Sequence, residues 1–100
     1  MIRHVYLFRI KEGIDKQTVV DRLLTLKDRV PYIHDIEVAQ DFKHTDNSYD
    51  IIEQCTFLTK EDFISFGNDS YHASIREYMK EVQLDGIKID YEINHTLKNW

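Results

Sequence analysis

The sequence is poor in the residues that mark several classes of protein. It has one cysteine, one proline and three glycines in 100 residues. A single cysteine excludes an intrachain disulfide and fits a reducing compartment such as the cytoplasm. So few prolines and glycines exclude a collagen-like repeat, a flexible linker and a loop-rich scaffold. We therefore expect a chain that is held together by a hydrophobic core and works in the cytoplasm.

Long apolar runs and an excess of basic charge are also missing. The apolar runs are too short for a transmembrane helix or for the core of a signal peptide. Thirteen basic and eighteen acidic residues give a net charge of −5. Nucleic acids and anionic membranes bind clustered Lys and Arg side chains. We expect neither a nucleic-acid partner nor a membrane partner.

The composition is that of one small folded domain. Hydrophobic residues make up 42% and charged residues 31% of the chain. A chain of this length buries enough surface for one modest core and is too short for two. We expect a single domain over residues 1–100, with its core at about 2–93.

Hydrophobic spacing predicts the element order β-α-β-β-α-β. Alternation predicts strands over 2–10, 33–42, 49–58 and 87–93. Apolar residues at three- and four-residue spacing predict one helix over 15–30, which is capped by Asp15 and ended by Pro31. A second helical segment starts at Thr59, breaks at 67–69 and resumes with Asp69 or Ser70 as its cap. This order predicts an α+β, ferredoxin-like fold, in which both helical segments cover one face of an antiparallel four-stranded sheet.

The other face of that sheet is predicted to be bare. Val5, Leu7 and Ile52 lie on it. An exposed apolar patch of this kind usually marks an interface. The simplest cover is a second copy of the chain related by a two-fold axis, so we expect a homodimer.

Five segments, taken in order, resemble the stress-responsive A/B barrel (Dabb) family. They are Arg3-His4-Val5-x-Leu7-Phe8, Val30-Pro31-Tyr32-Ile33, Tyr49-Asp50, the segment Phe66 to His72, and Ile87-Lys88-Ile89-Asp90-Tyr91. The resemblance implies a dimeric α/β barrel, in agreement with the bare sheet face. It does not imply one function, although a plant polyketide cyclase of this family uses a pocket between sheet and helices.

Two histidines are the candidate catalytic residues. The resemblance places His4 and His72 in that pocket, and histidine is the side chain best suited to proton transfer near neutral pH. His4 shares its strand face with Tyr6 and Phe8. His72 falls in the first turn of the last helix, where the helix N-terminus favours the neutral imidazole. The alternative is that both are structural histidines in a polar corner of the core.

The predicted ligand pocket departs from that of the plant cyclase. Its lining is expected to include Tyr6, Phe8, Leu23 and Phe66. Leu23 and Phe66 stand where the resemblance implies tyrosines. The His-Pro-x-His motif of the family reads Asp69-Ser70-Tyr71-His72 here. Cyclisation of a polyketide is therefore not expected.

Glu53 is the third candidate catalytic residue. It lies in the middle of a strand, on the face of Ile51, Cys55 and Phe57. A carboxyl group buried there must be paired or have a raised pKa. It is interpreted either as a base or orienting group beside His4, or as a structural group in a salt bridge with Arg3 or Arg76 or turned to water.

The remaining candidates for chemistry are weak. The five histidines are scattered and show no metal-ligand spacing, so we expect no metal site and no cofactor, although an ion near Pro31 is left open. Cys55 is interpreted as a small buried hydrophobe. Trp100, in the tail after Asn94, is a candidate for docking on the domain.

Three functions are compatible with these patterns. The first is a small enzyme or binding protein for an apolar or aromatic metabolite, with His4 and His72 in its pocket. The second is a stress-response dimer without catalysis. The third is a cofactor-free oxygenase.

Overall fold

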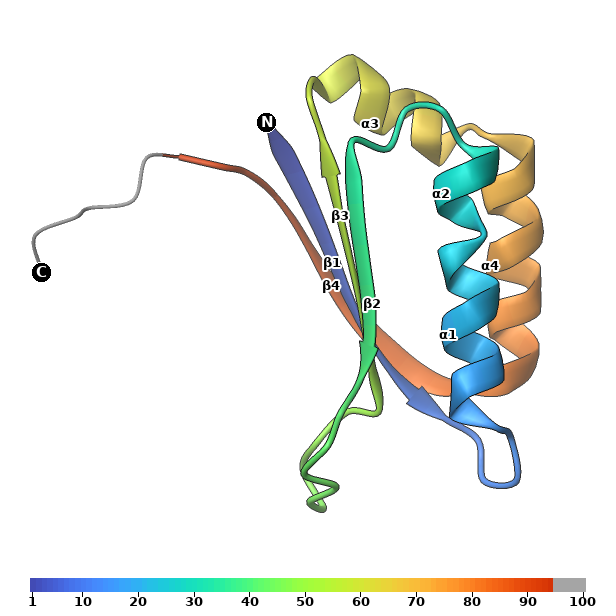
Figure 1. Ribbon diagram of the computed structural model, residues 1–100. Helices are drawn as coiled ribbons and strands as arrows, with labels where there is room; N and C mark the ends of the chain where they lie inside the picture. The colour runs from blue at the N-terminus through green and yellow to red at the C-terminus, as the bar shows by residue number, and fades with distance from the viewer. Residues whose placement is uncertain (95–100) are drawn as a thin grey trace, which may run out of the picture.

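Four strands form one antiparallel sheet in the computed structural model, which describes residues 1–94 (Figure 1). The order across the sheet is β2-β3-β1-β4. The elements are β1 (Ile2–Ile10), α1 (Lys16–Leu24), α2 (Leu26–Arg29), β2 (Asp35–Gln40), β3 (Ile51–Phe57), α3 (Lys60–Gly67), α4 (Ser70–Val82) and β4 (Gln83–Glu92). This arrangement confirms the predicted ferredoxin-like α+β fold. Trp100 lies outside the described residues.

The helices cover one face of the sheet and leave the other face uncovered (Figure 1). Alternate residues of β1, namely Ile2, His4, Phe8 and Ile10, are buried on the covered face. The core is completed by apolar side chains from α1, α2, β3, α3 and α4. None of the helices within residues 1–94 is long and apolar enough to span a membrane.

Polar side chains cap the N-termini of three helices, as predicted. Asp15 accepts a hydrogen bond from the backbone N–H of Thr18, and Thr59 accepts one from that of Asp62. Asp69, rather than Ser70, caps α4. Each cap satisfies backbone donors that the first helical turn leaves without partners.

The first helical segment differs from the continuous helix that was predicted. Thr25 interrupts it between α1 and α2. The Thr25 hydroxyl donates to the Arg22 carbonyl oxygen and also lies 2.5 Å from the Tyr71 hydroxyl on α4. Such a bond from a threonine side chain back to the helix backbone competes with regular helical hydrogen bonding. Val30 then leaves the helix with extended backbone angles ahead of Pro31, as expected.

The last strand begins four residues earlier than predicted, directly after α4. Asp85-Gly86 has the composition of a turn, but Gly86 lies within β4 opposite Phe8. A Cβ atom at Gly86 would lie 2.4 Å from Cε1 of Tyr6 and 2.9 Å from the Leu7 carbonyl oxygen. Glycine is therefore required here by the ring that packs over the strand.

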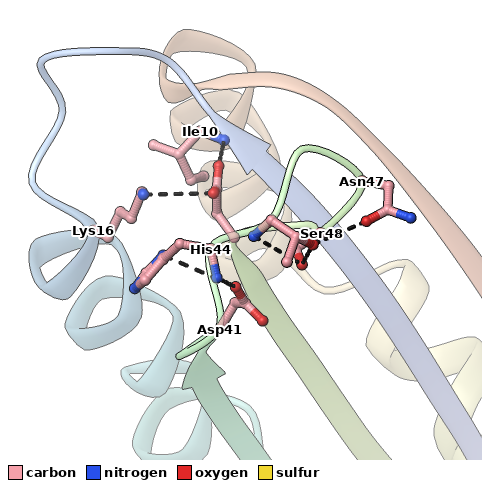
Figure 2. A network of polar contacts seen from close by, with 8 residues as sticks. Ile10, Lys16, Asp41, His44, Asn47 and Ser48 are labelled. Carbon is pink, nitrogen blue, oxygen red and sulfur yellow. Dashed lines mark hydrogen bonds and ion pairs between the residues drawn. The ribbon is translucent and has the colours of Figure 1, made fainter.

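A polar network fastens the β2–β3 connection to β1 and α1 (Figure 2). The carboxylate of Asp50 accepts a 2.7 Å hydrogen bond from the backbone N–H of Ile10 and lies 3.4 Å from Lys16 Nζ. Within the connection, Asp41 accepts from the backbone N–H of His44. The Asp50 carboxylate thus satisfies a backbone donor at the end of β1. Strands β2 and β3 are shorter at both ends than predicted.

Candidate functional site

A cavity of about 280 Å³ lies between the sheet and helices α1, α3 and α4. Every candidate pocket or catalytic residue of the sequence analysis lines it. These residues are His4, Tyr6, Phe8, Leu23, Glu53, Phe66 and His72. The fold thus brings them together, and their role in catalysis stays a prediction.

His4 lies between two carboxyl groups. Its Nδ1 is 2.5 Å from Oδ1 of Asp90 on β4, and its Nε2 is 3.7 Å from Oε2 of Glu53 on β3. The first contact is a hydrogen bond, so Nδ1 carries a proton that Asp90 accepts. The second is too long for a hydrogen bond. Nε2 is therefore the nitrogen of His4 that remains available to a ligand.

Glu53 is buried, with 4% of its surface exposed. Burial raises the pKa of its carboxyl group, and the neighbouring His4 and the Cys55 thiol offset part of that effect. The Cys55 Sγ donates to Glu53 Oε2 at 3.6 Å. No ion pair joins Glu53 to Arg3 or Arg76 in the described part of the chain, so the interpretation as a salt bridge with either arginine is wrong. Burial also raises the pKa of the Cys55 thiol, which removes it as a nucleophile.

His72 is held at the start of α4. Its backbone N–H donates to Asp69, and its ring stacks on the Phe66 ring at a centroid distance of 3.8 Å. The pKa of His72 is lowered to about 4, mainly by burial and in smaller part by the nearby charges of Arg76 and His4. The imidazole is therefore neutral at pH 7, as the sequence predicts, although burial is the main cause.

One ring nitrogen of His72 has two competing partners. Nδ1 lies 2.9 Å from the Phe66 carbonyl oxygen and 2.9 Å from Arg76 Nη1. A protonated Nδ1 donates to the carbonyl oxygen, whereas an unprotonated Nδ1 accepts from the guanidinium. Only one of these two bonds therefore forms at a time. The bond from the charged guanidinium is the stronger type. It leaves the proton of the neutral ring on Nε2.

An aromatic wall joins the two histidines. The Phe66 ring lies 5.9 Å from the His4 ring, so the two imidazoles flank one phenyl group. Tyr6 stacks on Phe8 at 4.4 Å and packs over Gly86. The cavity between the histidines is therefore apolar on most of its surface.

Four charged residues were not predicted to line the cavity, although Arg76 was considered as a partner of Glu53. They are Arg76 and Lys80 on α4 and Lys88 and Asp90 on β4. The alternation of β4 places Lys88 and Asp90 on the same face of the sheet. It does not determine whether that face is the covered or the uncovered one. Their pairing with β1, Lys88 opposite Tyr6 and Asp90 opposite His4, places them on the covered face. The four-residue spacing from His72 to Arg76 is the signal in the sequence that could have placed Arg76 beside His72.

The uncovered face carries the predicted interface residues. Leu7 lies opposite Ile52 on β3 and opposite Ile87 on β4, while Val5 lies opposite Ile89. Ile87 and Ile89 are 54% and 60% exposed, which extends the apolar surface across three strands. Their contribution to this surface was not predicted.

Possible metal ligands do not gather in the part of the chain that the structure describes. No group of three or more His, Cys, Asp and Glu side chains in residues 1–94 is arranged to hold a metal ion.

Comparison with known proteins identifies a family and a shared fold. The family profile described as "Stress responsive A/B Barrel Domain" matches residues 2–93. No curated protein matches the sequence. A solved structure from Arabidopsis thaliana has 17% identity, with 97% of this chain and 99% of that chain covered and a TM-score of 0.84.

Two further solved structures have the same fold. A hydroxynitrile lyase from Passiflora edulis has 16% identity, with 96% of this chain and 95% of that chain covered and a TM-score of 0.83. A dimeric ferredoxin-like protein of unknown function from Bacteroides fragilis has 18% identity, with 92% and 95% covered and a TM-score of 0.75. At such low identities the likeness establishes the fold alone.

Proposed function

The chain belongs to the stress responsive A/B barrel domain family, and from that premise we propose that it is a homodimer that binds an apolar or aromatic small metabolite and moves a proton on it. The observation that carries this proposal is the His4 imidazole, hydrogen-bonded to Asp90 and facing a cavity that also contains a neutral His72. A buried imidazole with one nitrogen held by a carboxylate leaves the other nitrogen free for proton transfer.

His4 is the proposed base. Asp90 accepts from Nδ1 and so fixes the tautomer in which Nε2 has a lone pair. An aspartate that holds a catalytic imidazole in this way also stabilises the imidazolium that forms. Asp90 is therefore a positioning residue. Glu53, whose raised pKa favours its neutral form, lies 3.7 Å from Nε2 without taking its lone pair.

His72 is the proposed hydrogen-bond donor rather than a second base. A group with a pKa of about 4 is a poor base at pH 7. With Arg76 donating to Nδ1, the Nε2–H is available to polarise a carbonyl oxygen of the ligand. Neutral imidazoles polarise carbonyl groups in other enzymes. The carbon that loses its proton to His4 would then lie next to that carbonyl.

The walls of the cavity favour an apolar ligand. Phe8, Leu23 and Phe66 line it, and they are buried side chains without hydroxyl groups. The hydroxynitrile lyase of the same fold indicates that a domain of this fold can have enzymatic activity. The residues of this chain, rather than the fold, are the basis for the chemistry proposed here.

The uncovered sheet face is the proposed dimer interface. Val5, Leu7 and Ile52 lie on it beside the exposed Ile87 and Ile89. The structural neighbour from Bacteroides fragilis is described as dimeric. Pairing through this face would leave the cavity, which lies on the helix side, open to solvent. We place the dimer in the cytoplasm, because the lone cysteine is a buried free thiol.

A thermal-shift screen tests the binding site. Small aromatic and acyl carbonyl compounds are screened against wild type, His4→Gln and His72→Gln, with the exposed His34→Gln as control. A ligand at one hundred times its Kd stabilises a protein by about 2.7 kcal/mol, which raises the Tm by roughly 10–20 °C in a domain of this size. We expect hits whose shift persists in His34→Gln and is reduced in both cavity variants. Hits that shift all four proteins equally, or no hits, contradict the proposal.

A further inference from the structure

Three cationic side chains line the cavity of a chain whose net charge is −5. Arg76 Nη1 contacts only neutral groups, His72 Nδ1 at 2.9 Å and the Gly67 carbonyl oxygen at 3.5 Å. Lys88 forms no ion pair within the described residues. Lys80 pairs with Glu77 in an exposed contact on α4, of a kind that adds little to stability.

The carboxyl groups of the cavity do not neutralise these cations. Glu53 lies behind His4 and is buried, and Asp90 is directed to His4 Nδ1. Arg76 and Lys88 therefore bring positive charge to a largely apolar cavity without a carboxylate partner of their own. Both residues are exposed, so water screens part of their charge, and the attraction for an anion comes from two cations acting together without a competing carboxylate.

We propose that the ligand of this cavity is a carboxylic acid, whose carboxylate binds Arg76 and Lys88 and whose apolar body packs against Phe8, Leu23 and Met79. This rests on the proposed function and names its substrate class. Arg76 Nη2 forms no hydrogen bond within residues 1–94, so the guanidinium can hold His72 through Nη1 and the ligand through Nη2. Lys88 approaches the cavity from β4, opposite Tyr6, while Arg76 approaches from α4.

The size of the cavity narrows the class of acid. Ligand pockets usually measure about 300–1,000 Å³, and this one measures about 280 Å³. It accommodates one aromatic ring or a short acyl chain. Arg76 lies one helical turn after His72, so the carboxylate would bind on the His72 side of the ligand.

The proposal is tested with two matched pairs of probes, benzoate with benzamide and hexanoate with hexanamide. The full-length ¹⁵N-labelled protein is titrated with each probe at constant ionic strength, and shifts of the amides of cavity residues report binding. We expect both acids to bind more tightly than their amides. Loss of a charge-assisted hydrogen bond typically costs a factor of about ten in affinity. We expect Lys88→Gln and Arg76→Gln to weaken the acids by about that factor. Lys88→Gln should not weaken the amides, and Lys27→Gln, an exposed change outside the cavity, should weaken neither acids nor amides.

The outcomes separate the two proposals. Equal binding of acid and amide at cavity residues overturns the carboxylate proposal and leaves the proposed binding site standing. A preference for acids that persists unchanged in both cavity variants also overturns it, because the anion is then held elsewhere. Absence of cavity shifts for all four probes contradicts both proposals.

Discussion

The side chains of His72 and Glu53 link the stability of the fold to pH in opposite directions. The folded-state pKa of His72 is about 4, below its ordinary value of 6.5. As pH falls through this window the unfolded chain takes up the proton first, so the free energy of unfolding decreases. The folded-state pKa of Glu53 is raised above 4.5. Its unfolded form therefore ionises first as pH rises, and that also decreases the free energy of unfolding.

Replacing His72 should remove one of these two effects. We expect the difference in free energy of unfolding between wild type and His72→Gln to shift against wild type as pH falls from 6.5 to about 4. Urea unfolding at several pH values measures it, and His34→Gln serves as the matched control. A difference that does not change with pH over this window would mean that the folded imidazole titrates like a free histidine.

At the level of single residues, the sequence predicted that His4, Glu53 and His72 lie in one cavity. It did not predict the side chain that positions His4. His4, Glu53 and His72 could be placed because their strand or helix positions point to one face. Asp90 and Lys88 could not be placed, because the alternation of β4 assigns two faces without orienting them. Only the pairing of His4 with Asp90 across β1 and β4 resolves that ambiguity.

The N-terminus of α4 positions the catalytic candidate that this helix carries. Asp69 accepts from the backbone N–H groups of Tyr71 and His72, at 2.8 and 3.0 Å. Asp15 caps α1 in a similar way through the backbone N–H of Thr18. The two caps are thus alike in chemistry, but only the cap at Asp69 lies beside the cavity.

Asp69→Ala and Asp15→Ala form a matched pair. We expect each change to lower the free energy of unfolding by about 1 kcal/mol, because a helix N-terminus loses its cap. We also expect amide hydrogen exchange to speed up at Tyr71 and His72 in Asp69→Ala only, and at Thr18 in Asp15→Ala only. Unchanged exchange at His72 in Asp69→Ala would show that the cap does not hold this turn.

At the level of elements, the sequence predicted the order and the caps better than the boundaries. The periodicities of 2 and 3.6 residues distinguish strands from helices, and Asp15, Thr59 and Asp69 mark helix starts. The break at Thr25 and the early start of β4 depend on contacts with other elements, Tyr71 on α4 and Tyr6 on β1. The spacing of residues along the chain does not reveal contacts between elements that are far apart in the sequence.

At the level of the whole molecule, the proposed dimer can be tested with two similarly exposed isoleucines. Ile89 on the uncovered sheet face is 60% exposed, and Ile64 on α3 is 59% exposed. We expect Ile89→Asp to yield a monomer, because it buries an unpaired charge in an interface that should exceed about 1,200 Å². Ile64→Asp should stay dimeric.

Sedimentation velocity at micromolar concentration measures the mass of each protein. A wild-type protein of 12.0 kDa in solution would contradict the dimer. A dimer that survives Ile89→Asp would place the interface elsewhere.

The exchange of carbon-bound hydrogen in D₂O tests the central claim, that this cavity moves a proton, most directly. Phenylpyruvate and phenylacetone are incubated with the protein, and NMR follows deuterium incorporation next to the carbonyl group. We predict exchange above the buffer rate that is lost in His4→Gln and strongly reduced in Asp90→Asn and His72→Gln, with mass and Tm retained. Exchange at the buffer rate with wild type, or catalysed exchange that survives His4→Gln, would contradict the account.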